Sequence, residues 1–455
     1  MRPTPMRTLR CHARATLVAA GAAALAVCLL PTATAQPAAA DTTARHAPAG
    51  GDPARAALPA GDGWGGAEGP VTGGAAAEPA FDFTVSDRAE LAAALAAGDP
   101  GTPRIIRVDG TIDANTDVKG DPLTCEDYAT DGYTLEGFLA AYDPETWGDV
   151  DPSGPMEEAR LASAARQAER VVLPVGSNTT IIGVGDDARL LGGTLNVSGA
   201  ENVVIRNLTF EDAYDCFPSW DPSGEWNSEY DNLQLSGSQR IWVDHNTFTD
   251  GDRRDSEQPY YFGYLYQQHD GLMDIVSGAD LVTVSWNVFT EHSKSILIGN
   301  SDNAGDTDRG ALRTTFHHNL FEDLGERAPR VRFGQVDVYN NHFRQTADSV
   351  VPYVYSFGIG RESALVAERN AFSLPYAVDP ATVIRQWTPD TAMTEDGNHL
   401  NGRPADLLAA YNEANPDAQL GDDAGWTPEL RTRIDHPRNL PALIDARAGA
   451  GGPLR

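Results

Sequence analysis

Three arginines stand close together in the segment GERAPRVRFG, at Arg327, Arg330 and Arg332. The rest of the protein is acidic: 34 lysines and arginines face 65 aspartates and glutamates, for a formal net charge of −31. A local cluster of cations in such a chain reverses the electrostatic field at one place, which suits the binding of an anionic ligand. The strongly negative total argues against nucleic acid or an anionic membrane as a partner.

Two aspartates, Asp270 and Asp274, lie four positions apart in the segment HDGLMD. On an extended strand, residues an even number of positions apart point to the same face of the sheet. Such a pair is most often a solvated surface feature, but the repeat counting described below brings Asp231 to the same place. Three converging carboxylates repel one another, and Ca²⁺, which takes roughly 6–8 oxygen ligands, removes that cost. We therefore predict a Ca²⁺ site formed by these three residues.

The elements that must position these groups are short β-rich runs, each closing on an asparagine followed by a phenylalanine. The runs are VVIRNLTF, IWVDHNTF, VTVSWNVF, TTFHHNLF, VDVYNNHF and LVAERNAF. Their asparagines are Asn207, Asn246, Asn287, Asn319, Asn341 and Asn370. Recurring units of strand length indicate a solenoid, in which asparagines stack at a turn and phenylalanines stack inside. We predict an all-β parallel β-helix with short peripheral helices and with long loops that form a cleft; an antiparallel sandwich is the alternative.

The spacing of the asparagines gives an approximate register. The shortest interval, 22 residues from Asn319 to Asn341, estimates one coil without insertions, so longer intervals indicate inserted loops. Segments 251–268 and 300–310 are candidates for such loops. After reduction by one coil, five charged residues fall at nearly the same angular position; they are Asp231, Asp270, Asp274, Lys294 and Arg327. The acids and the cations are therefore predicted to share one face of the solenoid.

The N-terminal region predicts export. Residues 1–35 combine a basic start, an apolar core and an A-x-A cleavage site, as a secretory signal peptide does. Cleavage there removes four arginines and no acid, so the mature charge becomes 30 − 65 = −35. Residues 36–80, rich in Ala, Gly and Pro, are predicted to be a flexible linker. Residues 81–455 are predicted to form the β-helix domain, and we expect a secreted monomer.

Further elements are expected at the edges of the domain. Helices are predicted from a cap at Ser86 to Gly98, at 155–170, at 405–414 and at 427–434. Cys125 and Cys216 remain after signal cleavage, and in an exported chain they could form one disulfide. The sequence alone leaves open whether the two cysteines are close.

Three segments resemble the pectate lyases of polysaccharide lyase family one. They are IWVDHNTF at 241–248, HDGLMDIVSGADLVTVSWN at 269–287 and RAPRVRFGQVDVYNN at 327–341. The last contains the family signature R-x-P-x-x-R, and the likeness covers most of 81–375. The resemblance implies a right-handed parallel β-helix and Ca²⁺-dependent cleavage of polygalacturonate by β-elimination, which yields 4,5-unsaturated oligogalacturonides in pectin degradation.

The resemblance also implies a role for each charged residue. By this likeness, Asp231, Asp270 and Asp274 match the calcium-binding acids, Arg327 matches the catalytic base, and Lys294 and Arg332 match residues that bind the uronate carboxylate. An arginine acting as a base, with an ordinary pKa above about 12, implies an alkaline activity optimum. Arg330 is left as structural support.

Competing functions remain open at this point. A pectin lyase would act on methylated pectin, but the complete set of three acids favours the unesterified polymer. A polygalacturonase would need carboxylates as acid and base, and the G-H-G motif of that family is missing from the sequence. A non-catalytic polyuronate-binding β-helix would keep the fold and the charges but would not need Arg327.

Overall fold

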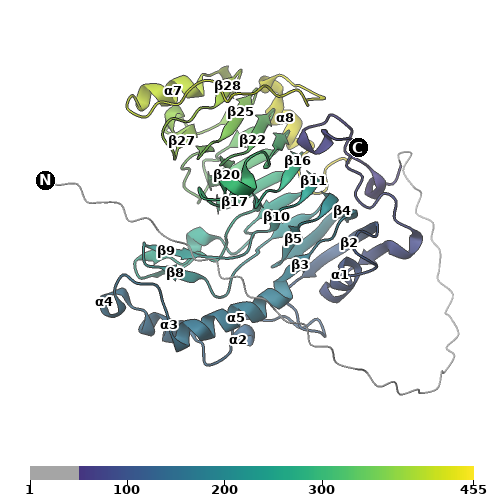
Figure 1. Ribbon diagram of the computed structural model, residues 1–455, viewed down its shortest axis with the longest axis vertical. Helices are drawn as coiled ribbons and strands as arrows, with labels where there is room; N and C mark the ends of the chain where they lie inside the picture. The colour runs from purple at the N-terminus through teal and green to yellow at the C-terminus, as the bar shows by residue number, and fades with distance from the viewer. Residues whose placement is uncertain (1–50, 455) are drawn as a thin grey trace. The chain divides into compact units, whose positions relative to one another are not determined.

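Parallel strands stack as successive coils in the computed structural model of the protein, which describes residues 51–454 (Figure 1). One wall of the coils is an eight-stranded parallel sheet in the order β3-β5-β10-β15-β18-β21-β24-β27. Its strands are β3 (Val172–Pro174), β5 (Thr194–Ser198), β10 (Leu233–Ser236), β15 (Met273–Val276), β18 (Leu297–Ile298), β21 (Arg330–Val331), β24 (Phe357–Ile359) and β27 (Ile384–Gln386). Asp274 and Arg330 lie on strands of this wall, and the other charged residues singled out above lie within three residues of one: Asp231, Asp270, Lys294, Arg327 and Arg332.

The other two walls belong to an 18-stranded sheet, because the long strand β4 (Thr179–Leu191) pairs with strands of both. One wall contains β1 (Asp82–Val85), β2 (Arg104–Asp113), β6 (Glu201–Arg206), β11 (Gln239–Asp244), β16 (Asp280–Ser285), β19 (Thr314–His317), β22 (Gln335–Tyr339), β25 (Ala364–Glu368) and β28 (Thr394–Asp396). The other contains β7 (Thr209–Glu211), β12 (Thr247–Thr249), β17 (Val288–Lys294), β20 (Leu320–Glu326), β23 (His342–Arg344), β26 (Ala371–Ser373) and β29 (His399–Leu400). The predicted parallel β-helix is confirmed.

Buried asparagines form a ladder at the turn between these two walls. The side-chain amide of Asn246 donates to the Oδ1 atom of Asn287 at 3.0 Å, and the pattern repeats through every following coil. The ladder continues through Asn319, Asn341, Asn370 and Asn398. Each amide also donates to a main-chain carbonyl, so the turn's buried polar groups are satisfied. The intervals of 41, 32, 22, 29 and 28 residues each span one coil.

Stacked phenylalanines follow the asparagines on the inner side, as predicted. Neighbouring ring centroids lie 4.6–5.3 Å apart with nearly parallel planes. The stack consists of Phe210, Phe248, Phe289, Phe321, Phe343 and Phe372. These rings belong to one continuous apolar core enclosed by the three walls.

Asn207 does not join the ladder. The pairings Arg206 with Asp244 and Thr209 with Thr247 place Asn207 beside His245, and Leu208 beside the first ladder asparagine. The amide of Asn207 instead donates to the carbonyls of Gly183 and Gly185. Its segment NLTF is one residue longer than NTF, so the shared phenylalanine shifts the asparagine out of register.

The flexible linker predicted for 36–80 is wrong over residues 51–80. This segment contains three short 3-10 helices, η1 (Pro53–Arg55), η2 (Trp64–Gly66) and η3 (Pro79–Phe81). The amide of Gly65 donates to Thr283 Oγ1 at 3.0 Å, and Trp64 packs on Trp426 with ring centroids 5.6 Å apart. Small residues suit segment 51–80 because its backbone packs directly on the backbone of the strands. A Cβ at Gly74, for example, would collide with the carbonyl of Arg104. The predicted signal peptide and residues 36–50 lie outside the described residues.

Helices cover the edges of the stack. The described helices are α1 (Arg88–Leu95), α2 (Cys125–Tyr128), α3 (Leu135–Ala141), α4 (Pro144–Trp147), α5 (Pro155–Val171), α6 (Gly305–Asp308), α7 (Leu407–Ala414) and α8 (Leu440–Asp445). Asp87, rather than Ser86, caps α1 by accepting from the amide of Glu90. The helix predicted at 427–434 is not formed. None of the helices in the described part of the chain combines the length and apolar character needed to cross a membrane.

A second, aromatic cluster lies under α2, α3 and α5, near two hairpins. These pair β8 (Ser219–Asp221) with β9 (Glu225–Asn227), and β13 (Tyr260–Tyr261) with β14 (Tyr264–Leu265). A third antiparallel pair joins β29 to β30 (Arg403–Pro404). Cys125 and Cys216 form a disulfide that ties α2 to the segment before β8, with Cα atoms 5.3 Å apart. The loop 251–268 folds back through the β13–β14 hairpin toward Asp270.

Candidate active site

Three carboxylates converge at the N-terminal ends of β10 and β15 in the eight-stranded wall. Asp231 precedes β10, Asp270 ends the loop before β15, and Asp274 lies within β15. One oxygen of each lies within 4.8 Å of the others. The predicted convergence of residues from successive coils is therefore confirmed.

The backbone between the acids is shaped for close approach. The N–H of Gly271 donates to Asp231 Oδ1 at 2.8 Å, and the N–H of Leu297 donates to Asp274 Oδ1 at 3.0 Å. A Cβ added at Gly271 would lie 2.6 Å from Asp231 Oδ1 and 2.8 Å from Asp274 Oδ1. Only glycine fits at this position without moving a carboxylate.

The three acids are held at an electrostatic cost. Asp231 is 2% and Asp274 is 8% exposed. Burial raises the pKa of Asp231 well above its ordinary value, and repulsion from Asp274 and Asp270 raises it further. Burial and the charge of Asp270 raise the pKa of Asp274 to about 7. The ionised trio needs positive charge close by.

The protein supplies only part of that charge. Lys294, the last residue of β17, places Nζ 3.2 Å from Asp270 Oδ1. Within the described residues, Asp231 and Asp274 make no ion pair closer than 4.0 Å. Three carboxylates and one lysine leave −3 + 1 = −2, which a divalent cation would balance. Oxygen donors at this spacing fit a hard ion such as Ca²⁺.

Arg327 lies beyond Lys294 at the turn between β20 and β21. Its backbone φ is +62°, a left-handed conformation that many residues at the turns of this solenoid share. Its Nε atom lies 3.3 Å from Glu326 Oε1. Burial lowers the pKa of Arg327, but Glu326 and Asp274 raise it by more, so the net pKa is above the ordinary value.

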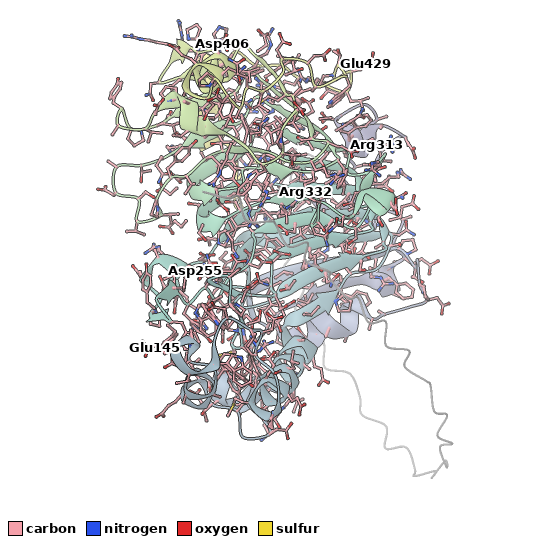
Figure 2. All side chains as sticks on the ribbon, turned by 60° about the vertical axis from the view of Figure 1, so that its left-hand side comes forward. Glu145, Asp255, Arg313, Arg332, Asp406 and Glu429 are labelled. Carbon is pink, nitrogen blue, oxygen red and sulfur yellow. A yellow bond between two sulfur atoms is a disulfide. The ribbon has the colours of Figure 1, made fainter. Side chains whose placement is uncertain are left out.

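Arg330 and Arg332 point outward on either side of the buried Val331, in line with strand alternation. Arg332 donates from Nε to Asp302 Oδ1 at 2.7 Å and from an Nη atom to the carbonyl of Gly299 at 2.7 Å. Asp302 comes from the 300–310 segment. Figure 2 shows Arg332 between Asp255 and Asp406 along the stack of coils.

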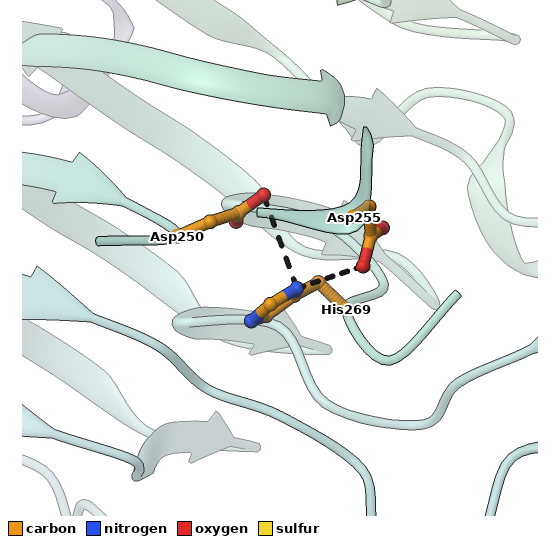
Figure 3. Close-up of side chains that lie close together, drawn as sticks. All are labelled: Asp250, Asp255 and His269. Carbon is orange, nitrogen blue, oxygen red and sulfur yellow. Dashed lines mark hydrogen bonds and ion pairs between the residues drawn. The ribbon is translucent and has the colours of Figure 1, made fainter. Parts of the chain in front are cut away.

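A second group of ionisable residues, which sequence reasoning missed, adjoins Asp270 through the preceding residue, His269. Asp250, Asp255 and His269 also place potential ligand atoms within 4.8 Å of one another (Figure 3). His269 Nδ1 lies 2.9 Å from Asp255 Oδ1 and 3.9 Å from Asp250 Oδ2. Its Nε2 atom lies 3.0 Å from Asp212 Oδ1. The adjacency of His269 to Asp270 in HDGLMD was the available signal.

The second group neutralises itself. His292 Nδ1 lies 2.7 Å from Asp250 Oδ1, while its Nε2 faces the carbonyls of Asp270 and Lys294 at 2.9 and 3.0 Å. Carbonyls only accept hydrogen bonds, so Nε2 of His292 carries a proton, and an ionised Asp250, which also only accepts, favours a second proton on Nδ1. Burial lowers the pKa of His269 and of His292, but the surrounding carboxylates raise both by more.

The charges of this second group sum to zero. The set consists of Asp212, Asp250, Asp255, His269, His292 and Arg253, whose Nε lies 3.1 Å from Asp212 Oδ1. Three carboxylates, two imidazoliums and one guanidinium give −3 + 2 + 1 = 0. We infer a scaffold that holds the main chain of Asp270 and Lys294, rather than a second metal site.

Comparison with known proteins agrees with this fold. The sequence profile of the family described as pectate lyase matches residues 147–418. The pectate lyase of Bacillus subtilis (strain 168) is 43% identical over 395 residues, covering 86% of this chain and 92% of the relative. Pectate lyase D of Dickeya chrysanthemi is 35% identical, covering 74% of this chain and 76% of the relative.

Solved structures give the same result. A Bacillus subtilis pectate lyase variant superposes with a TM-score of 0.83 at 42% identity, covering 88% of this chain and 99% of the other. A pectate lyase bound to a hexasaccharide also reaches 0.83 at 42% identity, covering 88% of this chain and 98% of the other. The chain therefore belongs to the pectate lyase family of polysaccharide lyases.

Proposed function

We propose that Asp231, Asp270 and Asp274 bind Ca²⁺ and that this lyase cleaves polygalacturonate at the adjoining arginines. The observation that carries the proposal is the residual charge of −2 at three converging, largely buried carboxylates. Asp231, Asp270 and Asp274 would hold the Ca²⁺, which when bound would supply positive charge that makes the C5 proton of a uronate more acidic. The relative bound to a hexasaccharide supports an oligouronide as the ligand class.

The chain's own residues then supply binding and proton transfer. Lys294 and Arg332 pair with the C6 carboxylate of the uronate and stabilise the enolate-like charge that develops there. Arg327 removes the proton from C5. The C5–H electron pair forms the C4–C5 double bond, the bond from C4 to the glycosidic oxygen breaks, and that oxygen keeps the bonding pair and takes up a proton from the protonated Arg327 or from water. The products are a free reducing end and a 4,5-unsaturated uronide.

The base role of Arg327 depends on its surroundings. Glu326 and Asp274 favour its protonated form. Balancing the charge of Asp274 removes part of that stabilisation of the guanidinium, and alkaline solution assists further. We therefore expect an alkaline rate optimum; a maximum below neutrality would contradict an unprotonated Arg327.

Two substitutions test this assignment. Arg327→Lys keeps a cation but changes the position and basicity of the nitrogen, so it should abolish unsaturated product, followed by ultraviolet absorbance, while leaving binding of oligogalacturonate detectable by calorimetry. Arg403→Ala, at an exposed position on β30, is the matched control and should behave as wild type. Unchanged turnover by Arg327→Lys would contradict the proposal.

We also propose that the protein is secreted. The signal-like residues 1–35 and the Cys125–Cys216 disulfide both fit an oxidising, extracellular compartment. N-terminal sequencing of the protein from culture medium should begin after Ala35; recovery of the full-length chain only from cells would contradict this.

A further inference from the structure

The outer face of the eight-stranded wall continues beyond the proposed active site. Arg330 on β21 pairs with Gly358 on β24, which pairs with Arg385 on β27. Just beyond the ends of these strands, the N–H of Gly360 donates to the carbonyl of Val331 and that of Trp387 to the carbonyl of Ile359, so the same register continues through Arg332, Gly360 and Trp387. The positions between the two basic strands are therefore both glycine.

The two glycines make room for the arginine side chains. A Cβ at Gly358 would lie 2.9 Å from Arg330 Cγ, and one at Gly360 would lie 3.0 Å from Arg332 Cγ. The guanidinium of Arg332 turns back to Asp302 and Gly299, whereas the aliphatic stem of Arg330 lies across the bare backbone of β24. This direction carries the Arg330 guanidinium toward β27 and away from the acid trio.

Trp387 receives two guanidiniums. Arg330 Cζ lies 3.9 Å and Arg385 Cζ lies 4.5 Å from a Trp387 ring centroid, both within the range of a cation–π contact. Trp387 is 40% exposed, and Arg385 is exposed as well. The indole fixes the two cations without neutralising them.

Neither arginine has an acidic partner. Among residues 51–454, no carboxylate lies within 4.0 Å of the guanidinium of Arg330 or Arg385, although the chain carries nearly twice as many acids as bases. The Nε atom of Arg330 is buried with no hydrogen-bond acceptor. Two cations left unpaired on one surface of a strongly acidic protein point to an anionic ligand from outside the chain.

We propose that Arg330, Arg385 and Trp387 form a distal subsite that binds the carboxylate of a further uronate residue of the polymer. Strands of one wall are about 4.8 Å apart, so β27 lies roughly 10 Å beyond β21. Only a substrate several residues long can occupy this subsite and the cleavage site together. The inference rests on the proposed function, because it takes the same polyuronate as ligand.

The test compares substrate lengths. For Arg385→Ala, KM on hexagalacturonate should rise about tenfold, the worth of one charge-assisted contact, and the rise should shrink steadily as the oligomer is shortened. Arg385→Glu should raise KM further, because it adds repulsion. Trp387→Ala should resemble Arg385→Ala, and Arg403→Ala, an exposed arginine away from this wall, is the control.

The outcomes separate the subsite from the reaction. A KM that rises equally for short and long oligomers, or not at all, with unfolding temperature unchanged, would overturn the subsite while leaving the lyase assignment intact. If wild-type protein forms no unsaturated product, the proposed function fails. Calorimetric binding of hexagalacturonate to wild type and Arg385→Glu then decides the subsite by itself: equal affinity would overturn it, and weaker binding by the variant would support it.

Discussion

Two groups of acidic residues lie side by side in this protein, and they differ in how their charge is balanced. Asp231, Asp270 and Asp274 share one lysine and retain a net charge of −2. Asp250 and Asp255, with Asp212, surround two histidines and an arginine and sum to zero. Both groups bring ligand atoms within 4.8 Å of one another.

The comparison shows that distance alone does not define a metal site. A buried carboxylate needs a counter-charge, and the protein can supply one or leave that role to an ion. In the second group histidines fill the space and the charge that a cation would take. In the first, backbone amides hold the carboxylates in place and leave their charge largely uncompensated. The self-balanced group then supports the other through His292 and the carbonyl of Asp270.

The largest expected effect comes from removing a ligand of the first group. Asp231→Asn should lower turnover of polygalacturonate at a fixed, low Ca²⁺ concentration by roughly a thousandfold, equivalent to about 4 kcal/mol. Because the substitution also removes repulsion, the Ca²⁺-free protein should become more stable to heat. Rates measured across a Ca²⁺ titration, beside thermal unfolding in chelator, check both signs. Wild-type turnover would place the cation elsewhere.

A change in the second group should act on stability instead. His269→Asn leaves buried carboxylates without a counter-charge, which should lower the free energy of unfolding by about 3 kcal/mol. Added Ca²⁺ should not restore the loss at this group. Denaturant unfolding of wild type and variant, with and without Ca²⁺, measures it. If Ca²⁺ restored the full free energy of unfolding of the variant, the second group would be a cation site too, and the two groups would not differ in how their charge is balanced.

A smaller effect is expected at the backbone between the ligands. Gly271→Ala inserts a methyl group into a space bounded by Asp231 and Asp274, and overpacking of this kind costs about 1–3 kcal/mol. The strain should appear mainly as weaker Ca²⁺ affinity, measured by calorimetry. Gly176→Ala is the control, because a Cβ at Gly176 would lie 3.9 Å from its nearest neighbour. Gly263→Ala would not serve, because the positive φ of Gly263 strains any residue with a Cβ. Equal affinity in the Gly271 and Gly176 variants would contradict the close approach.

Much of the fold was predictable because its physical signals repeat. Six asparagine–phenylalanine segments predicted the coils, and a count of positions brought three distant aspartates together. Asn207 was misplaced because one extra residue precedes its phenylalanine, and Asn398 was missed because leucine follows it two positions on. A repeating sequence pattern therefore aligns successive coils correctly only where no single residue has been inserted or replaced within the repeat.

The parts that escaped prediction depend on contacts between distant segments. Residues 51–80 have too few large apolar side chains to fold alone, but they pack on a wall that is already formed. The partners of His269 come from two separate segments, one with Asp212 and one with Asp250 and Asp255, so no local pattern indicates their network. The pairing of Arg330 and Arg385 on Trp387 likewise exists only once β21 and β27 are aligned.

The most direct test of the charge-balance account is turnover of polygalacturonate with and without a Ca²⁺ chelator, followed by the ultraviolet absorbance of the unsaturated product. The account predicts that chelator abolishes product formation by folded protein, that Ca²⁺ restores it, and that Asp231→Asn needs far more Ca²⁺ for the same rate. Full activity in chelator, with the protein free of bound metal by elemental analysis, would contradict the claim that the first group owes its function to a cation.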